Sequence, residues 1–149
     1  MDYYDTSFLV PLFIREATTP RIEAFMTQIG TRALAISQVA RIEFSSVLGR
    51  DVRMGFLQAA DARDLAATFD SFVQNSFEIL LPAVEDYDLA RDYLARHETG
   101  LRAADALHLA VARNRGAEAI YSLDKTLLKA GKRLGLPVGT GIRLAGYGR

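Results

Sequence analysis

Short apolar segments alternate with longer helical patterns along this chain, and this alternation constrains its fold most strongly. Apolar segments predict strands at residues 1–5, 33–37, 77–81, 118–122 and 137–138. The last is expected at a sheet edge, because Pro137 has no N–H to donate. Helices are predicted in the intervals, at residues 7–16, 20–29, 38–53, 56–75, 84–97, 101–115 and 125–134. This order favours an α/β fold, with helices on both faces of a parallel sheet of four or five strands.

The size of the chain fits a single domain covering residues 1–149. A chain of 149 residues buries roughly two-thirds of its unfolded surface, and the sequence contains no linker or repeat. The absence of cysteine excludes disulfides, thiolate metal sites and cysteine nucleophiles. The first residues lack the basic segment of a signal peptide, and no apolar run is long enough to span a bilayer. We therefore expect a cytoplasmic protein that does not engage a membrane.

Charge is balanced overall but unevenly distributed. The net charge is zero, yet residues 51–98 carry ten acids and four bases, and residues 113–149 carry eight bases and two acids. The basic C-terminal part favours contact with a polyanion, and the acidic middle favours a basic partner. Two solvated faces that neutralise each other explain the same pattern, so charge alone leaves both interpretations open.

Two aspartates directly follow predicted strands. Asp5 ends the first strand and Asp124 follows the fourth, and each precedes a predicted helix. Taken singly, each is predicted to be an N-cap, because aspartate is favoured at that position. Both also fall at the carboxyl end of a strand, where open α/β sheets bind ligands near a switch in strand order.

Glu43 interrupts an apolar stripe on a predicted helix. Val39 and Val47 lie four residues before and after it, so the three side chains share one side of the helix. A carboxylate in such a stripe is costly unless it is paired or bound to a cation. The competing interpretation is a boundary position from which the carboxylate reaches water.

Asp105 lies in the least polar helical pattern of the chain. The segment LRAADALHLAVA is apolar apart from Arg102, Asp105 and His108, which are spaced three apart and lie along one side of the helix. Two interpretations of Asp105 compete. It forms a salt bridge with Arg102, or it is a metal ligand near the positive end of the helix dipole.

Together the four acids predict a common site. The strand ends and helices that carry them can converge at one edge of a doubly wound sheet. Four unpaired carboxylates repel each other, and Mg²⁺ or Mn²⁺ is the usual counterion for such a group of oxygen ligands. Two such ions about 4 Å apart can activate water and stabilise both oxygens of a phosphodiester displacement. This reasoning predicts a metal-dependent nuclease site at Asp5, Glu43, Asp105 and Asp124.

Four segments, DTSFLVPLF, ISQVARIEFSSVL, LRAADALHLAVA and IYSLDKTLLKAGKRLGL, follow one another in an order that resembles the PIN domain, and specifically the VapC-type toxins of prokaryotic toxin–antitoxin pairs. The resemblance covers essentially the whole chain. It implies a three-layer α/β/α fold and an endoribonuclease that needs Mg²⁺ or Mn²⁺ and uses metal-activated water. The acids of the family match Asp5, Glu43, Asp105 and Asp124, which are therefore the implied catalytic residues and metal ligands.

The resemblance also implies residues that contact the substrate. Small hydroxyl residues beside the first and last acids match Thr6, Ser7 and Ser122, and Ser37 ends the second strand, where the family often carries a hydroxyl. Basic residues that could contact the RNA backbone are Lys125, Lys129, Lys132 and Arg133, although lysines on a final helix are most often only solvated. His108 is expected to be packed or hydrogen-bonded near the site, because the family does not require it as a general base.

Partners follow from the same resemblance. Relatives form homodimers and are silenced by a VapB-type antitoxin that reaches into the acidic site, often with an arginine. The segment FSSVLGRDVRMGFL could contact such a partner or fill the core. The competing function is a catalytically silent PIN-like scaffold that binds RNA or protein. A haloacid-dehalogenase-like phosphatase is disfavoured because Ser7 stands where it needs a second acid, and DNA remains open as a substrate.

Overall fold

The computed structural model of the chain, which describes residues 1–146, contains a parallel sheet in its middle layer. The strands of the described residues are β1 (Asp2–Tyr4), β2 (Leu34–Ser37), β3 (Glu78–Leu80), β4 (Ala119–Tyr121) and β5 (Val138–Gly139), in the spatial order β3-β2-β1-β4-β5. Every pairing is parallel, and β5 lies at an edge. These observations confirm the predicted parallel sheet, including its edge strand after Pro137.

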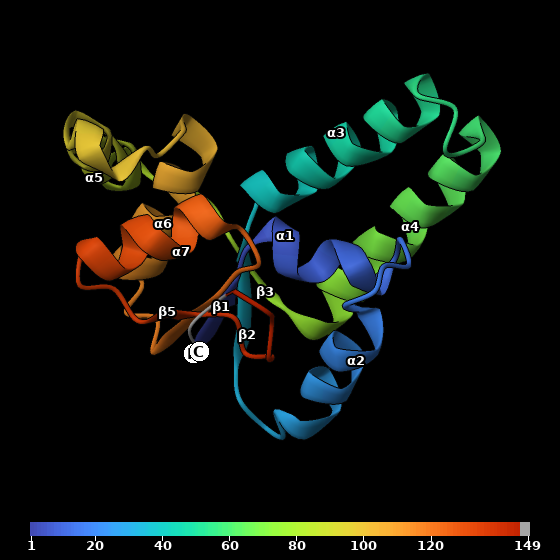
Figure 1. Cartoon of the computed structure of the whole chain (residues 1–149), viewed down its shortest axis with the longest axis horizontal. Helices are drawn as coiled ribbons and strands as arrows, with labels where there is room; N and C mark the ends of the chain where they lie inside the picture. Colours follow the sequence, from blue (N-terminus) through green and yellow to red (C-terminus); the bar gives the residue numbers. More distant parts are fainter. Residues whose placement is uncertain (147–149) are drawn as a thin grey trace.

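Helices cover both faces of this sheet (Figure 1). One face carries α1 (Thr6–Leu9), a 3₁₀ turn η1 (Val10–Leu12), α2 (Thr19–Gln28), α3 (Val39–Arg53) and α4 (Ala59–Ser76). The other face carries α5 (Val84–Ala95), a 3₁₀ turn η2 (His97–Thr99), α6 (Ala103–Asn114) and α7 (Lys125–Arg133). The predicted three-layer α/β/α architecture is therefore confirmed.

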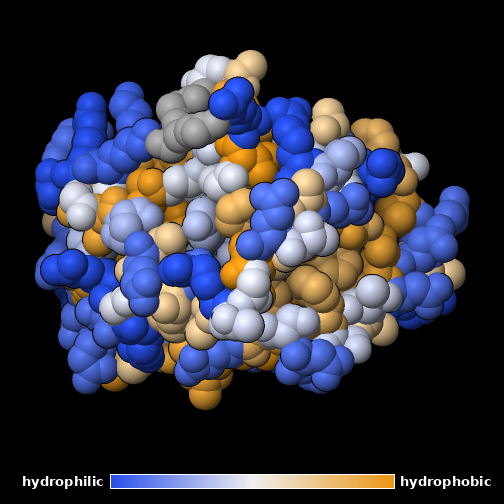
Figure 2. Space-filling view, turned by 90° about the horizontal axis from the view of Figure 1, so that it is seen from below, coloured by the Kyte–Doolittle hydropathy of each residue, from blue (hydrophilic) through white to orange (hydrophobic). Residues whose placement is uncertain are grey.

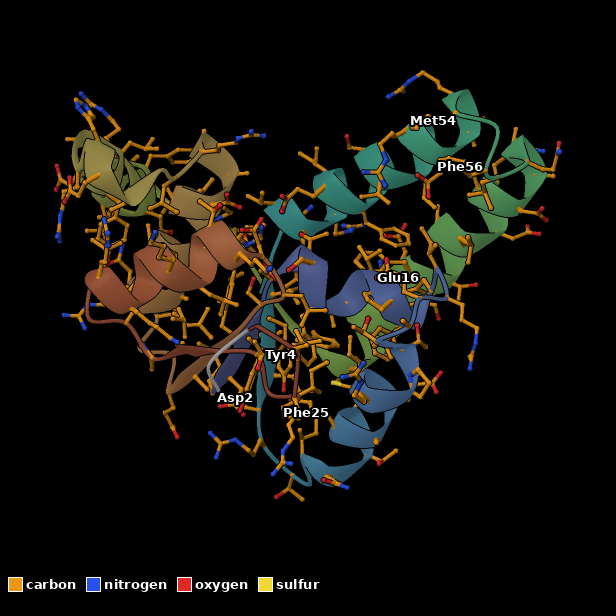
Figure 3. The ribbon with its side chains drawn as sticks, viewed as in Figure 1. Asp2, Tyr4, Glu16, Phe25, Met54 and Phe56 are labelled. Carbon is orange, nitrogen blue, oxygen red and sulfur yellow. The ribbon has the colours of Figure 1, made fainter. Side chains whose placement is uncertain are left out.

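The alternation of side chains along the strands creates two separate cores. Successive residues of a strand point to opposite faces of the sheet. Tyr3 accordingly packs with the apolar residues of α6, whereas Tyr4 packs with Phe8 and Phe77 on the other face. In Figure 3, Tyr4 and Phe25 both lie on the side of the sheet that α2 covers. Because both faces are buried, the strands read as continuous apolar runs in the sequence.

One predicted helix is wrong. The sequence predicted a helix over residues 7–16, but α1 ends at Leu9 and the chain continues as the 3₁₀ turn η1. Pro11 explains the difference, because it has no N–H to donate to the carbonyl four residues earlier. The other predicted helices begin and end within three residues of those observed.

Helices α3 and α4 form a long hairpin that projects from the body of the protein (Figure 1). Met54 and Phe56 lie at its tip, with 58% and 73% of their surfaces exposed (Figure 3). Phe44 and Leu48, nearer the base of the hairpin, are buried. The segment FSSVLGRDVRMGFL thus divides into a part that fills the core and a part that stays accessible.

The topology fixes where a ligand site is expected. The chain moves from β1 through β2 to β3, then returns to the other side of β1 to form β4 and β5. The switch in strand order lies at β1 and β4, and ligands bind outside the carboxyl ends of strands at such a point. Figure 2 shows the face toward the opposite, amino ends of the strands, where hydrophilic residues surround smaller hydrophobic areas. Within residues 1–146, no helix is long and apolar enough to cross a lipid bilayer.

Candidate active site at the carboxyl edge of the sheet

Asp5 lies at the carboxyl end of β1 and is almost fully buried. Its Oδ1 accepts hydrogen bonds from Ser7 Oγ at 2.7 Å and from the backbone N of Phe8 at 3.3 Å, which caps α1. Its Oδ2 accepts from Ser122 Oγ at 3.1 Å. Burial raises the pKa of Asp5 to about 6, although His108 and the two serine hydroxyls act to lower it. The predicted cap is confirmed, and it coincides with a position at the edge of the site.

Asp124 caps helix α7 immediately after β4. Its Oδ1 accepts from the backbone N of Leu127 at 2.9 Å, so the predicted cap is confirmed here as well. The hydroxyl of Ser122 accepts from the backbone N of Asp124 at 3.0 Å while it donates to Asp5. Ser122 therefore ties the two strand-end acids together.

Asp105 lies in the first turn of α6 and is half-buried. Burial and the negative charges of Asp124 and Asp5 raise its pKa to about 6. Among residues 1–146 its side chain has no recorded ion pair, and Arg102 is exposed rather than paired with it. The salt-bridge interpretation of Asp105 is therefore wrong, and the carboxylates of Asp124 and Asp5 repel its charge more strongly than His108 attracts it.

Glu43 reaches the site from the second turn of α3. Its Oε1 accepts from Thr6 Oγ1 at 2.7 Å and also from Nε2 of the buried His108. Burial acts to raise the pKa of Glu43, but the bonds from His108 and Thr6 outweigh it and lower the pKa below its ordinary value. For His108, burial acts to lower the pKa, but the bond to Glu43 and nearby acids raise it. Glu43 is thus an ionised carboxylate held by two hydrogen bonds. This contradicts the competing interpretation of Glu43 as a boundary residue that only reaches water.

These side chains border one polar cavity of about 500 Å³, which we call the acidic pocket. It is lined by Glu43, Gly100, Arg102, Ala104, Asp105, Asp124 and Thr126. Asp5 lies close enough to raise the pKa of Asp105, although it does not line the pocket itself. The structure therefore brings the four predicted acids together from four separate segments of the chain.

The donor set of the acidic pocket suits a hard divalent cation. Carboxylate oxygens are the ligands that Mg²⁺ and Mn²⁺ prefer, and a bound cation would relieve the repulsion that raises the pKa of Asp105. Among residues 1–146, no three Asp, Glu or His side chains are grouped closely enough to form a ready-made metal cage. Mutual repulsion of the carboxylates opposes such close grouping.

The remaining predicted site residues surround this centre in different ways. The hydroxyls of Thr6, Ser7 and Ser122 hold Glu43 and Asp5, so their contact with a substrate stays a prediction. Ser37 is buried, and its Oγ accepts from the backbone N of Val39 at the start of α3. Lys125 is exposed at the first position of α7.

Sequence reasoning missed three residues of the site. Tyr3 binds the ring of His108, and Arg102 and Thr126 line the acidic pocket. The spacing of Arg102 relative to Asp105 was a signal, but it pointed to a salt bridge instead of the pocket wall. No signal connected Tyr3 with Glu43, because the two residues meet through His108 only in the folded chain.

The three-layer α/β/α fold, with an acidic pocket at the switch in strand order, places the protein in a class of α/β proteins that gather carboxylates at the carboxyl edge of a parallel sheet. The chain belongs to the PIN-domain family, whose model matches residues 3–133.

Several solved structures share this fold, and one of them is a toxin. VapC20 from Mycobacterium tuberculosis, described as a sarcin–ricin loop cleaving toxin, has a TM-score of 0.70 and 22% identity, over 88% of this chain and 95% of its own. FitAcB from Neisseria gonorrhoeae has a TM-score of 0.72 and 17% identity, over 95% and 98%. VapBC2 from Rickettsia felis, solved with a promoter DNA fragment, has a TM-score of 0.67 and 14% identity, over 93% and 98%. A search of curated proteins found no match. At these identities the likeness establishes the fold.

Proposed function

We propose that this chain is a divalent-metal-dependent endoribonuclease and the toxin of a VapBC-type toxin–antitoxin pair. The observation that carries the proposal is the convergence of Asp5, Asp105 and Asp124 with Glu43 around one polar pocket at the switch point of the sheet. Membership of the PIN-domain family supports it. A metal-binding nuclease needs such a group of acids, whereas a purely structural role does not explain why Asp105 faces the like charges of Asp124 and Asp5.

The contacts of the four acids indicate different roles in the proposed mechanism. Asp105 and Asp124, which line the pocket, would hold Mg²⁺ or Mn²⁺ together with Asp5 behind them. Such an ion, once bound, would activate water and stabilise the leaving oxygen of the phosphodiester. Glu43 has its Oε1 held by Thr6 and His108, and it would orient the attacking water or add one ligand oxygen.

RNA is the proposed substrate, and cations at the rim of the acidic pocket would contact its backbone. Arg102 lines the pocket and is exposed, and it forms no ion pair among residues 1–146. Lys125, Lys129 and Lys132 are exposed on α7, which begins at the pocket. Lys and Arg side chains bind phosphate groups without sequence preference. The name of VapC20 as a toxin that cleaves the sarcin–ricin loop supports RNA as the substrate class.

A VapB-type antitoxin is the proposed partner, in a complex in which the toxin is a homodimer. The structures of VapBC2 and FitAB, which share this fold, were solved bound to DNA fragments, and the resemblance to VapC-type toxins implies an antitoxin of the VapB type. The exposed Met54 and Phe56 at the tip of the α3–α4 hairpin offer apolar side chains for such a contact. The cytoplasm is the expected location of a toxin that acts on RNA.

The test is an endonuclease assay on a mixed pool of structured and unstructured RNA, with Mg²⁺, Mn²⁺ or EDTA. Wild-type protein is compared with Asp5→Asn and Asp105→Asn, and with Asp64→Asn as a matched control on the exposed face of α4. We expect metal-dependent cleavage by the wild type and Asp64→Asn, and none by the two site variants.

The same assay separates the competing scaffold function from the nuclease. If purified, antitoxin-free protein binds metal and RNA but cleaves no RNA, the chain is a scaffold. If it cleaves single-stranded DNA as fast as RNA, the substrate class is wider than proposed. If Asp5→Asn and Asp105→Asn cleave as well as the wild type, the acidic pocket is not the active site.

A further inference from the structure

We propose that Tyr3 and His108 are positioning residues that fix the carboxylate of Glu43, so that Oε1 is anchored and Oε2 alone is presented to the acidic pocket. This inference rests on the proposed nuclease function and assigns a role to two residues outside the four acids.

Hydrogen bonds form one continuous network from the sheet to the acidic pocket. The hydroxyl of Tyr3, on β1, lies 2.6 Å from Nδ1 of His108, on α6. The other ring nitrogen, Nε2, donates to Oε1 of Glu43, on α3. Thr6 Oγ1, at the start of α1, donates to the same oxygen at 2.7 Å. Three distant parts of the sequence, at residues 3–6, 43 and 108, therefore meet around one carboxylate.

The hydrogen-bond chemistry of the ring makes this arrangement independent of its charge. A carboxylate only accepts, so Nε2 carries the hydrogen in the bond to Glu43. The hydroxyl of Tyr3 can donate to Nδ1 of the neutral ring and can accept from Nδ1–H of the imidazolium. Tyr3 therefore fixes the ring plane in both states, as a second partner does for a histidine next to a metal site.

The hydrogen bonds of Tyr3 and His108 are buried, which restricts the motion of both rings. Tyr3 is fully buried and His108 is 1% exposed, within the core that also contains Leu107 and Leu109. The two rings pack edge to face, with centroids 5.9 Å apart. Polar groups in such a core are costly unless every one is satisfied, and an apolar pair would fill the same space more simply. The network is satisfied, and its outer end is a carboxylate that lines the acidic pocket.

The two oxygens of Glu43 consequently have different roles. Oε1 accepts from two donors, whereas Oε2 has no recorded hydrogen bond or ion pair among residues 1–146. Asp5 differs, because both of its oxygens accept hydrogen bonds. Glu43 can therefore offer one oxygen, Oε2, to a metal ion or to the attacking water, because the two acceptor positions of Oε1 are already occupied by hydrogen bonds.

The experiment uses three variants, each of which removes or replaces one group of the hydrogen-bonded network of Tyr3, His108 and Glu43. Tyr3→Phe removes one hydroxyl and keeps the ring. His108→Leu removes both ring nitrogens, and His108→Gln keeps an amide that can donate to Glu43. Each protein is tested for RNA cleavage, for Mn²⁺ affinity by calorimetry and for thermal unfolding.

We expect His108→Leu to lower kcat and Mn²⁺ affinity about 10- to 100-fold, the usual effect of losing a partner of a ligand. KM for RNA should stay unchanged, because Tyr3 and His108 are buried and do not reach the cations at the rim of the acidic pocket. His108→Gln should recover a large part of both losses, and Tyr3→Phe should lower kcat by a smaller factor than His108→Leu.

Tyr3→Phe keeps the proposal falsifiable if His108→Leu fails to fold. Wild-type kcat and Mn²⁺ affinity in folded Tyr3→Phe would then overturn it, and so would a folded His108→Leu that is as active as the wild type. A loss in unfolding temperature with no change in kcat or Mn²⁺ affinity would also overturn it, because it indicates a purely structural role. A wild-type protein that neither binds Mn²⁺ nor cleaves RNA would instead refute the proposed function, which separates the two failures.

Discussion

At the scale of residues, one side chain can serve the fold and the site together. The sequence predicted Asp5 and Asp124 as caps and, in combination, as ligands; both hydrogen-bond as caps, Asp124 in the lining of the acidic pocket and Asp5 buried beside it. Periodicity and strand ends were enough to find them. The partner of Glu43 was not predictable, because His108 lies 65 positions away and the two side chains meet only where α3 and α6, from opposite faces of the sheet, reach its carboxyl edge.

Asp105→Asn should stabilise the metal-free protein while it abolishes cleavage. The carboxylate faces Asp124 and Asp5, which raise its pKa, so removing the charge relieves repulsion. We expect a gain of about 1 kcal/mol at pH 8, limited by solvent screening at this half-exposed position. Chemical denaturation in EDTA measures it, with Asp64→Asn as the control. A clear loss of stability relative to that control would show that Asp105 is held by favourable contacts instead.

Arg102→Ala should weaken RNA binding without weakening metal binding. Arg102 lines the acidic pocket, is exposed, and is not paired with Asp105. We expect a higher KM for RNA and an unchanged affinity for Mn²⁺. The salt dependence of RNA binding should become smaller, because a protein with one cation fewer neutralises fewer phosphates and releases fewer counterions. Binding to a catalytically inactive Asp105→Asn background at several salt concentrations provides the measurement. An unchanged salt slope would remove Arg102 from the RNA-contacting surface.

At the scale of elements, loops after parallel strands carry the site and helices hold it in place. The sequence predicted most helices to within three residues, because their apolar periodicity is long and regular. The segment 7–16 was mispredicted because one proline changes its second turn to 3₁₀ geometry. The cap of α7 and its packing against β5 together set the position of Asp124.

The cap and ligand roles of Asp124 can be separated by substitution. Asparagine also caps helices well, whereas alanine does not. Asp124→Asn should therefore unfold close to the wild-type temperature and lose most cleavage activity. Asp124→Ala should lose the activity and, in addition, about 1 kcal/mol of stability through the lost bond to Leu127 N. If Asp124→Asn retained full activity, Asp124 would be a cap only.

Gly131 is required for the contact between α7 and β5. A Cβ at this position would overlap the side chain of Val138, which lies directly against the helix. We expect Gly131→Ala to destabilise the protein by about 1–3 kcal/mol, despite the better helix propensity of alanine. The double variant with Val138→Ala should regain most of that loss in thermal unfolding. Equal stability of Gly131→Ala and the wild type would show that β5 moves away without cost.

At the scale of the whole molecule, the sheet topology concentrates negative charge at one edge of a chain with no net charge. The order of elements and the four acids were predictable from the sequence. Their distances were not, because these depend on how α3, α6 and α7 pack around the end of β1. The consequence is a protein whose stability should respond to pH and to divalent metal through one small region.

Metal-free protein should lose stability as pH rises from about 4 to above 6.5. Asp5 and Asp105 have pKa values of about 6 in the folded state, above the ordinary 3.8, so the folded protein binds more protons in this interval. The raised pKa of His108 acts in the same direction above 6.5. Glu43, whose pKa is lowered, acts oppositely only below about 4.5, where its contribution is lost as pH falls.

Mg²⁺ should reverse this loss. Because the ion binds ionised carboxylates, its stabilising effect should be larger at pH 8 than at pH 5. Thermal unfolding at both values, with and without Mg²⁺, measures the difference, and Asp5→Asn with Asp105→Asn serves as the control that should show little response. A Mg²⁺ effect of equal size at both pH values, or retained in the control, would place the bound ion elsewhere.

The most direct test of the central claim is an anomalous difference map from crystals grown or soaked with Mn²⁺. The convergence of the acids predicts a peak in the acidic pocket, within bonding distance of Asp105 and Asp124, with Oε2 of Glu43 facing it. Crystals of Asp105→Asn should show a weaker peak or none. A wild-type map with no peak there, at an Mn²⁺ concentration that supports cleavage of RNA, would contradict the assignment of the four acids as a metal site.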